Sequence, residues 1–221
     1  MLPAHVKAGV TTQDLDDLAE AYIRDHGGVP AFKGYHGFPS TLCTSVNEQC
    51  VHGIPNDRVL ADGDIISLDC GVIYDDLYTD ACITVPVGAI SSDAQELLNV
   101  TERALEEVVA MLRAGVHVGD VSALIQRVVE RAGFHPVKSL TGHGLGRHLH
   151  EYPDIPNRGK AGTGPAFPAG AVVAIEPIVS IGADDVTGIG DGWTLVTEDG
   201  SLAAHFEHTL LVLEGGCEVL A

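Results

Sequence analysis

Basic residues are scarce in this chain. Its 221 residues include 12 lysine and arginine residues against 31 aspartate and glutamate residues, which gives a formal net charge of −19 at pH 7. Proteins that bind nucleic acid contact its phosphates through lysine and arginine. The charge balance therefore argues against nucleic acid as a partner.

Cysteine and long apolar runs are also limited. The five cysteines are an odd number and none forms a Cys-x-x-Cys pair, which argues against a disulfide framework and against a thiolate zinc site. No apolar run approaches the roughly 18 residues that cross a bilayer, and the chain does not open on a signal-peptide pattern. We therefore expect a cytoplasmic protein with no membrane partner.

The apolar content, at 45%, is sufficient for a hydrophobic core, and the length fits a single domain over residues 1–221. Three segments have helical apolar stripes between a polar start and a glycine: 11–28, 91–115 and 119–133. Strand patterns cover 64–74, 77–87, 171–180, 192–200 and 204–213. We predict an α+β fold, an antiparallel sheet with helices packed on one side, in two halves related by a weak pseudo-two-fold.

One hairpin brings two acidic residues together. The pair 75–76, Asp-Asp, lies between two strand patterns, as a two-residue turn does. With the strands paired about that turn, Asp69 faces Cys82, and Asp80 lies two residues further along on the same side of the ribbon. Asp69 and Asp80 are then diagonal neighbours about 7 Å apart. A shift of one residue would place them on opposite faces, but their apolar neighbours favour a buried pair over two solvated acids.

Two further acids, Glu176 and Glu207, also lie in apolar strand patterns. A buried carboxylate is costly unless it is paired or bound to a metal, and close carboxylates repel by about 4 kcal/mol per pair at an effective dielectric near 20. Two divalent cations would cancel four such charges. His143, in the glycine-rich segment TGHGLG, supplies a nitrogen ligand, and we expect its glycines to make room for metal and substrate. Cobalt, manganese, iron and zinc all suit this set, and the native metal stays open.

The same segments, in the same order, resemble a known family. DCGVIYDDLYTD, TGHGLGRHLHEYPDIPN, AIEPIVS, DGWTLVTEDG and AHFEHTLLV look like type I methionine aminopeptidases of the pita-bread fold, and GYHGFPSTLCTSVNEQCVHGIP looks like their substrate-pocket segment. The resemblance runs from about Val10 to Cys217. It implies an enzyme that removes the N-terminal methionine from peptides and nascent proteins when the second residue is small.

The resemblance also assigns the metal ligands. It implies that Asp69 binds one ion, that His143 and Glu176 bind the other, and that Asp80 and Glu207 bridge the two. It gives Glu176 a second role, because the matching glutamate moves a proton during catalysis.

Further residues receive roles from the same resemblance. His52 and His150 match two histidines that hydrogen-bond to the substrate and the transition state. The residues expected to bind substrate are Tyr35, Phe38, Cys43, His52, His150 and Trp193. His205 and His208 flank Glu207, and whether they support the ligands is open.

The chain departs from the family in two respects. One further helix, which the family carries before the segment matching residues 5–18, is largely missing, and Phe32, Phe38 and Leu149 replace residues common in the pocket of relatives. Two alternatives remain, an X-Pro dipeptidase or aminopeptidase of the same fold and a non-catalytic binding module. We expect a monomer that acts on peptide N-termini. We also expect it to bind ribosomes weakly or not at all, because the chain and the ribosome are both negatively charged.

Overall fold

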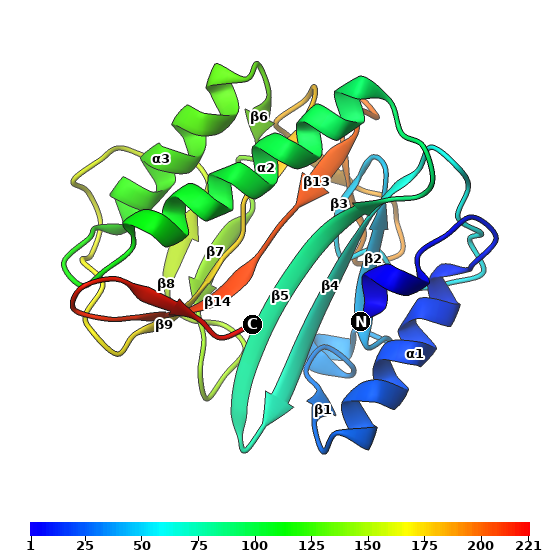
Figure 1. Cartoon of the computed structure of the whole chain (residues 1–221), viewed down its shortest axis with the longest axis horizontal. Coiled ribbons are helices and arrows are strands. Elements are labelled where there is room, and N and C mark those ends of the chain that lie inside the picture. The colour runs from blue at the N-terminus through cyan, green and yellow to red at the C-terminus, as the bar shows by residue number, and fades with distance from the viewer.

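The computed structural model describes residues 1–221 and combines α-helices with four antiparallel sheets (Figure 1). The helices are α1 (Thr12–Asp25), α2 (Ser92–Met111) and α3 (Val118–Arg131), with short 3-10 turns η1 (Leu2–His5) and η2 (Tyr35–Gly37). The strands are β1 (Val29–Pro30), β2 (Leu42–Val46), β3 (Gln49–Val51), β4 (Ile65–Tyr74), β5 (Leu77–Pro86), β6 (His135–Pro136), β7 (Thr141–Gly144), β8 (Glu151–Pro156), β9 (Val172–Ile175), β10 (Ile178–Ser180), β11 (Val186–Gly188), β12 (Leu195–Thr197), β13 (Ala203–His205), β14 (His208–Val212) and β15 (Cys217–Val219).

Local capping explains where the helices begin. The Thr11 hydroxyl accepts a hydrogen bond from the backbone N–H of Asp14, whose carboxylate accepts one from the backbone N–H of Thr11. The Ser91 hydroxyl accepts from the N–H of Ala94 at the start of α2. The three predicted helices are confirmed, and the apolar stripes of α2 and α3 are buried in one cluster with the strands beneath them.

The predicted hairpin is confirmed with its register. β4 pairs with β5 so that Asp69 lies opposite Cys82 and Gly71 lies opposite Asp80. Asp75 and Asp76 form the turn with φ values of 49° and 61°, which is the left-handed geometry of a type I′ hairpin turn. The acidic turn therefore sets which face each carboxylate of the hairpin occupies.

Two predicted strands are each divided in the structure. The segment 171–180 breaks at Pro177 into β9 and β10, because proline cannot donate to the ladder. The segment 204–213 also breaks, at Phe206 and Glu207, into β13 and β14. β9 pairs with β14, and β10 pairs with β13. Both segments therefore pass from one sheet to another, and they do so side by side. Glu176 and Glu207 therefore lie at the junctions between sheets, and their expected position inside continuous strands is wrong.

The helices and the polar residues lie on opposite faces of the strands. In β4, Ile66 and Leu68 pack under α1, whereas Asp69 points to the other side. In β14, Leu210 packs with α2 and α3, whereas Thr209 points the other way and its hydroxyl donates to the backbone carbonyl of Asp80. Figure 1 shows α2 and α3 over one half and α1 over the other. None of the helices combines the length and apolar character needed to cross a membrane.

Candidate metal centre and substrate pocket

A cavity of about 440 Å³ opens on the strand face that the helices leave free. Residues from five separate segments meet there, because the hairpin β4–β5 and the two sheet junctions converge. Cys82 at the hairpin and Glu207 at a junction exchange backbone hydrogen bonds of 3.3 Å and 2.9 Å, which join the two halves. The structure brings all five predicted metal ligands to this cavity: Asp69, Asp80, His143, Glu176 and Glu207.

The spacing of their ligand atoms suits a shared cation. His143 Nε2 lies 3.6 Å from Glu176 Oε1 and 4.0 Å from Asp80 Oδ2. Ligand atoms of Asp80, His143 and Glu207 all lie within 4.8 Å of one another. Hydrogen bonds are shorter than this, whereas two ligands each about 2.0–2.2 Å from one ion lie roughly 3–3.5 Å apart. The ligand atoms are therefore slightly further apart than they would be around a bound cation, which would draw them together.

The carboxylates need a cation for a second reason. One oxygen each of Asp69, Asp80 and Glu207 is buried without a hydrogen-bond partner. Desolvation raises the pKa of Asp69 to about 7. Desolvation and then repulsion from the other acids raise the pKa values of Asp80 and Glu207 well above the usual range, and the pKa of Glu176 rises for the same reasons. Divalent ions would satisfy the orphaned oxygens and neutralise the charge, so these residues fit a metal centre.

The orientation and protonation of the His143 ring suit a nitrogen ligand. Its Nδ1 donates to the backbone carbonyl of Gly144 at 2.9 Å, which leaves Nε2 free to face the acids. Desolvation lowers the pKa of His143, so the ring is neutral and can coordinate a metal.

The glycines beside His143 have a different role from the one expected. His143 lies on strand β7, between β8 and β9, and not in a turn. A Cβ on Gly142 would clash with the carbonyl of Ala174 in β9, and one on Gly144 would clash with the carbonyl of Tyr152 in β8. These glycines let three strands approach closely. The expectation that they make room for metal and substrate is wrong.

The predicted substrate residues line the same cavity. Tyr35, Phe38, Cys43, His52, His150 and Trp193 all face it. Phe38 and Trp193 pack edge to face with ring centroids 5.2 Å apart, and the Trp193 ring lies 6.4 Å from that of His52. His52 adopts a left-handed backbone with φ of 57°, which is uncommon for a non-glycine residue although histidine is among the types that tolerate it.

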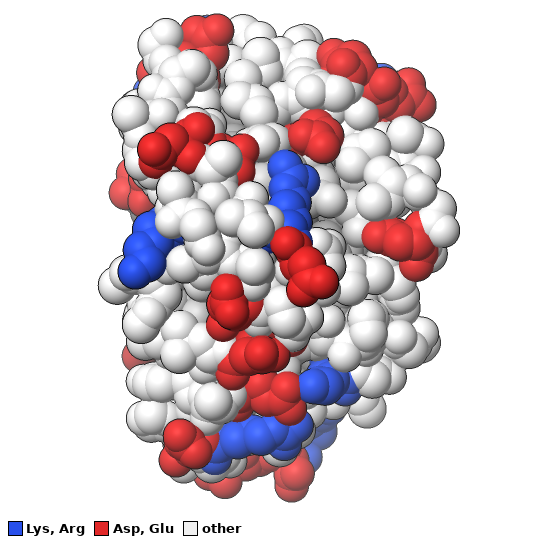
Figure 2. Space-filling model, turned by 90° about the vertical axis from the view of Figure 1, so that its right-hand side faces the viewer, with Lys and Arg blue, Asp and Glu red and all other residues white.

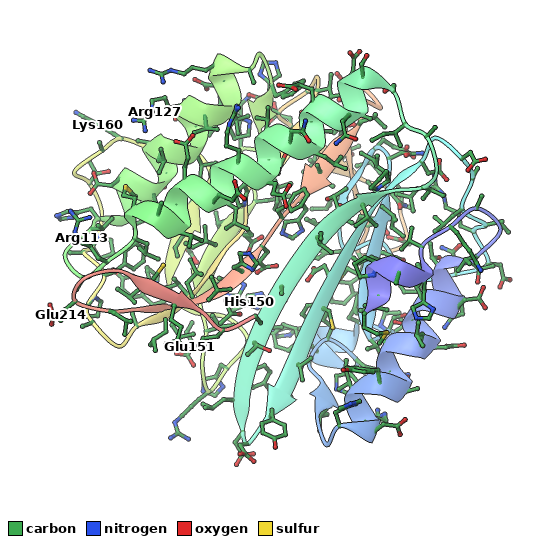
Figure 3. The ribbon with its side chains drawn as sticks, viewed as in Figure 1. Arg113, Arg127, His150, Glu151, Lys160 and Glu214 are labelled. Carbon is green, nitrogen blue, oxygen red and sulfur yellow. The ribbon has the colours of Figure 1, made fainter.

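His150 lies beside the metal ligands without joining them. Its ring centroid is 4.4 Å from that of His143, and its Nδ1 lies 2.8 Å from the Tyr35 hydroxyl. In the view of Figure 3, His150 lies beside β5, where the two halves of the molecule meet. Desolvation, followed by the neighbouring His143, lowers the pKa of His150 to about 4. The ring is therefore neutral at pH 7 and has one N–H to donate.

Sequence reasoning assigned no role to two residues of the cavity, His36 and Asp154, and left the role of His205 open. His36 lines the cavity although its side chain is also exposed. Asp154 lines it because β8 places it opposite His143, a pairing that a sequence pattern cannot show. His205 faces the acids from the end of β13. Its place two residues before Glu207, on the same face, was the one available signal.

The family model for "Metallopeptidase family M24" matches residues 1–214. The chain belongs to metallopeptidase family M24. A methionine aminopeptidase of Clostridium perfringens is 45% identical over 220 residues, which cover 100% of this chain and 88% of that protein. Methionine aminopeptidase 1 of Bacillus subtilis is also 45% identical, over 99% of this chain and 88% of its own length. The predicted family resemblance is confirmed, and membership of a metallopeptidase family implies a divalent metal.

Solved structures agree with the fold. The methionine aminopeptidase of Thermotoga maritima superposes with a TM-score of 0.98 at 44% identity, and the alignment covers 99% of this chain and 88% of that one. A prolidase of Pyrococcus furiosus shares the fold with a TM-score of 0.79, but it is 19% identical and the chain covers only 58% of it. The pita-bread fold is confirmed. The X-Pro alternative is not favoured, because the methionine aminopeptidases match far better in sequence and length.

Proposed function

We propose that this chain is an aminopeptidase that removes the N-terminal methionine from peptides and nascent proteins whose second residue is small, with two divalent metal ions as cofactors. The observation that carries the proposal is a set of three buried carboxylates, the part-buried carboxylate of Glu176 and one imidazole, which meet at the floor of a pocket with apolar walls. Relatives 41–46% identical over nearly the whole chain support the choice of substrate. Nascent chains as substrates place the proposed work in the cytoplasm.

We propose that the ligands divide between the two ions as the family resemblance implies. Asp69, whose buried oxygen has no other partner, would hold one ion. His143 and Glu176, 3.6 Å apart, would hold the other. Asp80 and Glu207 would bridge the two. When bound, the ions lower the pKa of a water molecule and polarise the scissile carbonyl. All five ligands come from one chain, so we propose that residues 1–221 act as one catalytic domain and as a monomer.

The surrounding residues supply the remaining chemistry. If the Tyr35 hydroxyl donates to His150 Nδ1, then Nε2 carries the ring proton and can donate it in a hydrogen bond to the substrate carbonyl as charge develops there. Glu176 accepts and returns the proton of the attacking water. His52 contributes a second polar contact, beside Trp193.

The pocket also explains recognition of an N-terminus. Phe38, Cys43, Leu149 and Trp193 form an apolar wall that suits the unbranched thioether of methionine. With the four acids neutralised by the ions, the negative charge of the molecule as a whole still favours the free α-ammonium of the substrate.

Metal removal and replacement test the proposal. Dialysis against a strong chelator should abolish release of methionine from Met-Ala-Ser, and manganese or cobalt should restore it with about two ions bound per chain. Met-Leu peptides should react far more slowly, and Ala-Pro peptides should not react. Full activity in the metal-free protein would refute the two-ion mechanism, and preferential cleavage of Ala-Pro would favour the X-Pro alternative.

A further inference from the structure

His205 is a buried imidazole that the proposed ligand set does not use. It ends strand β13, is 3% exposed and lines the cavity. Its Nε2 is buried and has no hydrogen-bond partner. Such an orphaned atom is rare in folded proteins and calls for a physical explanation.

The surroundings of that nitrogen are acidic. His205 Nε2 lies 3.6 Å from Glu207 Oε2 and 3.8 Å from Glu176 Oε2. The other oxygen of Glu176, Oε1, faces His143 Nε2 at 3.6 Å. Glu176 therefore lies between two imidazoles, with one oxygen toward each.

The two imidazoles differ on their far side. His143 donates through Nδ1 to the carbonyl of Gly144, which leaves its Nε2 bare for an ion. The ring of His205 makes no such bond, so no carbonyl fixes its Nδ1 as the protonated nitrogen. A bare lone pair on Nε2 would face two carboxylate oxygens and be repelled, whereas an N–H there is attracted.

The backbone of His205 is held firmly by the hairpin. Its N–H donates to the Thr84 hydroxyl at 2.8 Å, and its carbonyl accepts from the same hydroxyl at 2.7 Å. The thiol of Cys82 also donates to that carbonyl at 3.5 Å. The backbone of His205 is therefore fixed while its ring points at the two carboxylates. A movement of a few tenths of an ångström would bring Nε2 and the carboxylate oxygens into hydrogen-bond range.

We infer that His205 is a positioning residue of the metal centre, whose Nε2–H donates to the carboxylates of Glu207 and Glu176 and orients them without ligating an ion. The inference rests on the proposed two-ion function. It predicts opposite tautomers for the two buried imidazoles, with the proton on Nδ1 in His143 and on Nε2 in His205.

Nitrogen NMR of the zinc-loaded wild-type protein tests the tautomers directly. Long-range proton–nitrogen correlations should show His205 protonated at Nε2 and His143 protonated at Nδ1. A proton on Nδ1 of His205, with Nε2 shifted by bound zinc, would make His205 a ligand and overturn the inference.

Two variants test the effect on metal binding, with Co²⁺ as the probe for calorimetry and visible absorption. His205→Leu should weaken Co²⁺ binding by about 10- to 100-fold, as loss of a hydrogen bond to a ligand does. His205→Gln, whose amide N–H₂ can donate from a similar place, should recover most of the affinity with the wild-type Co²⁺ spectrum. Wild-type affinity in the leucine variant, or an altered spectrum in the glutamine variant, would contradict the positioning role.

His208→Gln is the matched control. His208 flanks Glu207 on the other side, and its ring bonds the carbonyl of Ala221 outside the cavity, so its Co²⁺ affinity should not change. If the wild-type protein itself bound no Co²⁺, the proposed function would fail, whereas failure of the His205 variants alone would leave that function standing. If the leucine variant does not fold, the tautomer measurement decides.

Discussion

At the scale of single residues, His150 can be separated from the metal ligands. We expect His150→Ala to lower kcat by about 10²- to 10³-fold, as loss of a donor to a developing oxyanion does. The bound metal should stay near the wild-type level, because His150 is not one of the proposed ligands. Its Nδ1 contacts the Tyr35 hydroxyl and not the acids. Steady-state kinetics together with metal analysis would check this. Loss of metal from the variant would show that His150 is a ligand.

The buried acids make the stability of the metal-free protein depend on pH. Their pKa values are raised on folding, to about 7 for Asp69 and well above the usual range for Asp80, Glu176 and Glu207. A raised carboxyl pKa contributes stability at low pH that is lost as the pH rises toward the folded-state value. The buried histidines act with the opposite sign, but only below about pH 6.5, because their pKa values are lowered.

Between about pH 6.5 and 8 the acids therefore dominate. We expect the melting temperature of the chelated protein to fall across this range, while that of the manganese-loaded protein changes little because the ions replace the protons. The pKa values of the buried thiols are also raised, so ionisation of cysteine in the unfolded chain would lower the melting temperature further at higher pH. The pH range of the experiment ends below that point. Parallel thermal melts of the two forms would measure it. A chelated protein that became more stable with rising pH would contradict the account.

Much of the site could be predicted from single residues. Asp69 and Asp80 were placed together because strand alternation and a two-residue turn fix their faces. His205 was only an open candidate and Asp154 was not named, since each faces the cavity through a strand pairing, to Ile178 and His143 respectively. Local patterns carry no information about such partners.

At the scale of elements, β7 depends on its glycines. We expect Gly142→Ala to destabilise the protein by about 1–3 kcal/mol, because the new methyl group meets the carbonyl of Ala174 in β9. The same displacement of β7 should weaken metal binding through His143. Gly146→Ala is the control, since the atoms nearest to its new methyl group are 3.7 Å or more away, in the side chain of Glu151. Denaturant unfolding and Co²⁺ titration of both variants would check the prediction, which equal stabilities would contradict.

The helices were predicted well and the short strands were not. Each helix has its own capping residues and apolar stripe, which are local signals. The division of two strand patterns at Glu176 and Glu207 follows instead from a change of sheet, which depends on the whole fold. The β2–β3 turn uses Asn47 with φ of 58°, and its strands find partners in β4 and β12 that lie far along the chain.

At the scale of the whole molecule, charge governs encounters with large partners. Acidic side chains are spread over the face that carries α1, with basic ones between them (Figure 2). Lys138 pairs with Asp184 and Asp185, so it does not join Arg127 in a basic patch. Arg103, Arg127 and Arg131 instead line a shallow groove shared with Glu107 between α2 and α3, and Figure 3 shows Arg127 at the edge of the molecule.

We therefore expect weak affinity for ribosomes, because a net charge of −19 opposes approach to another polyanion. Co-sedimentation at moderate salt should leave most of the protein in the supernatant. A submicromolar complex that weakens as salt rises would contradict the prediction and would point to the arginine groove, where Arg127→Glu should then abolish binding.

Cross-strand pairing also places a thiol on each side of one carboxylate: Cys43 and Cys82 both lie directly opposite Asp69, on neighbouring strands. Sulfur is a soft ligand that prefers thiophilic ions, so the arrangement makes the centre vulnerable to heavy-metal poisoning. Cadmium should compete with manganese for this corner and inhibit at lower concentration than it does in a Cys43→Ala variant, as activity measured against added cadmium would show. Equal sensitivity of the two proteins would exclude the Cys43 thiol as the point of attack.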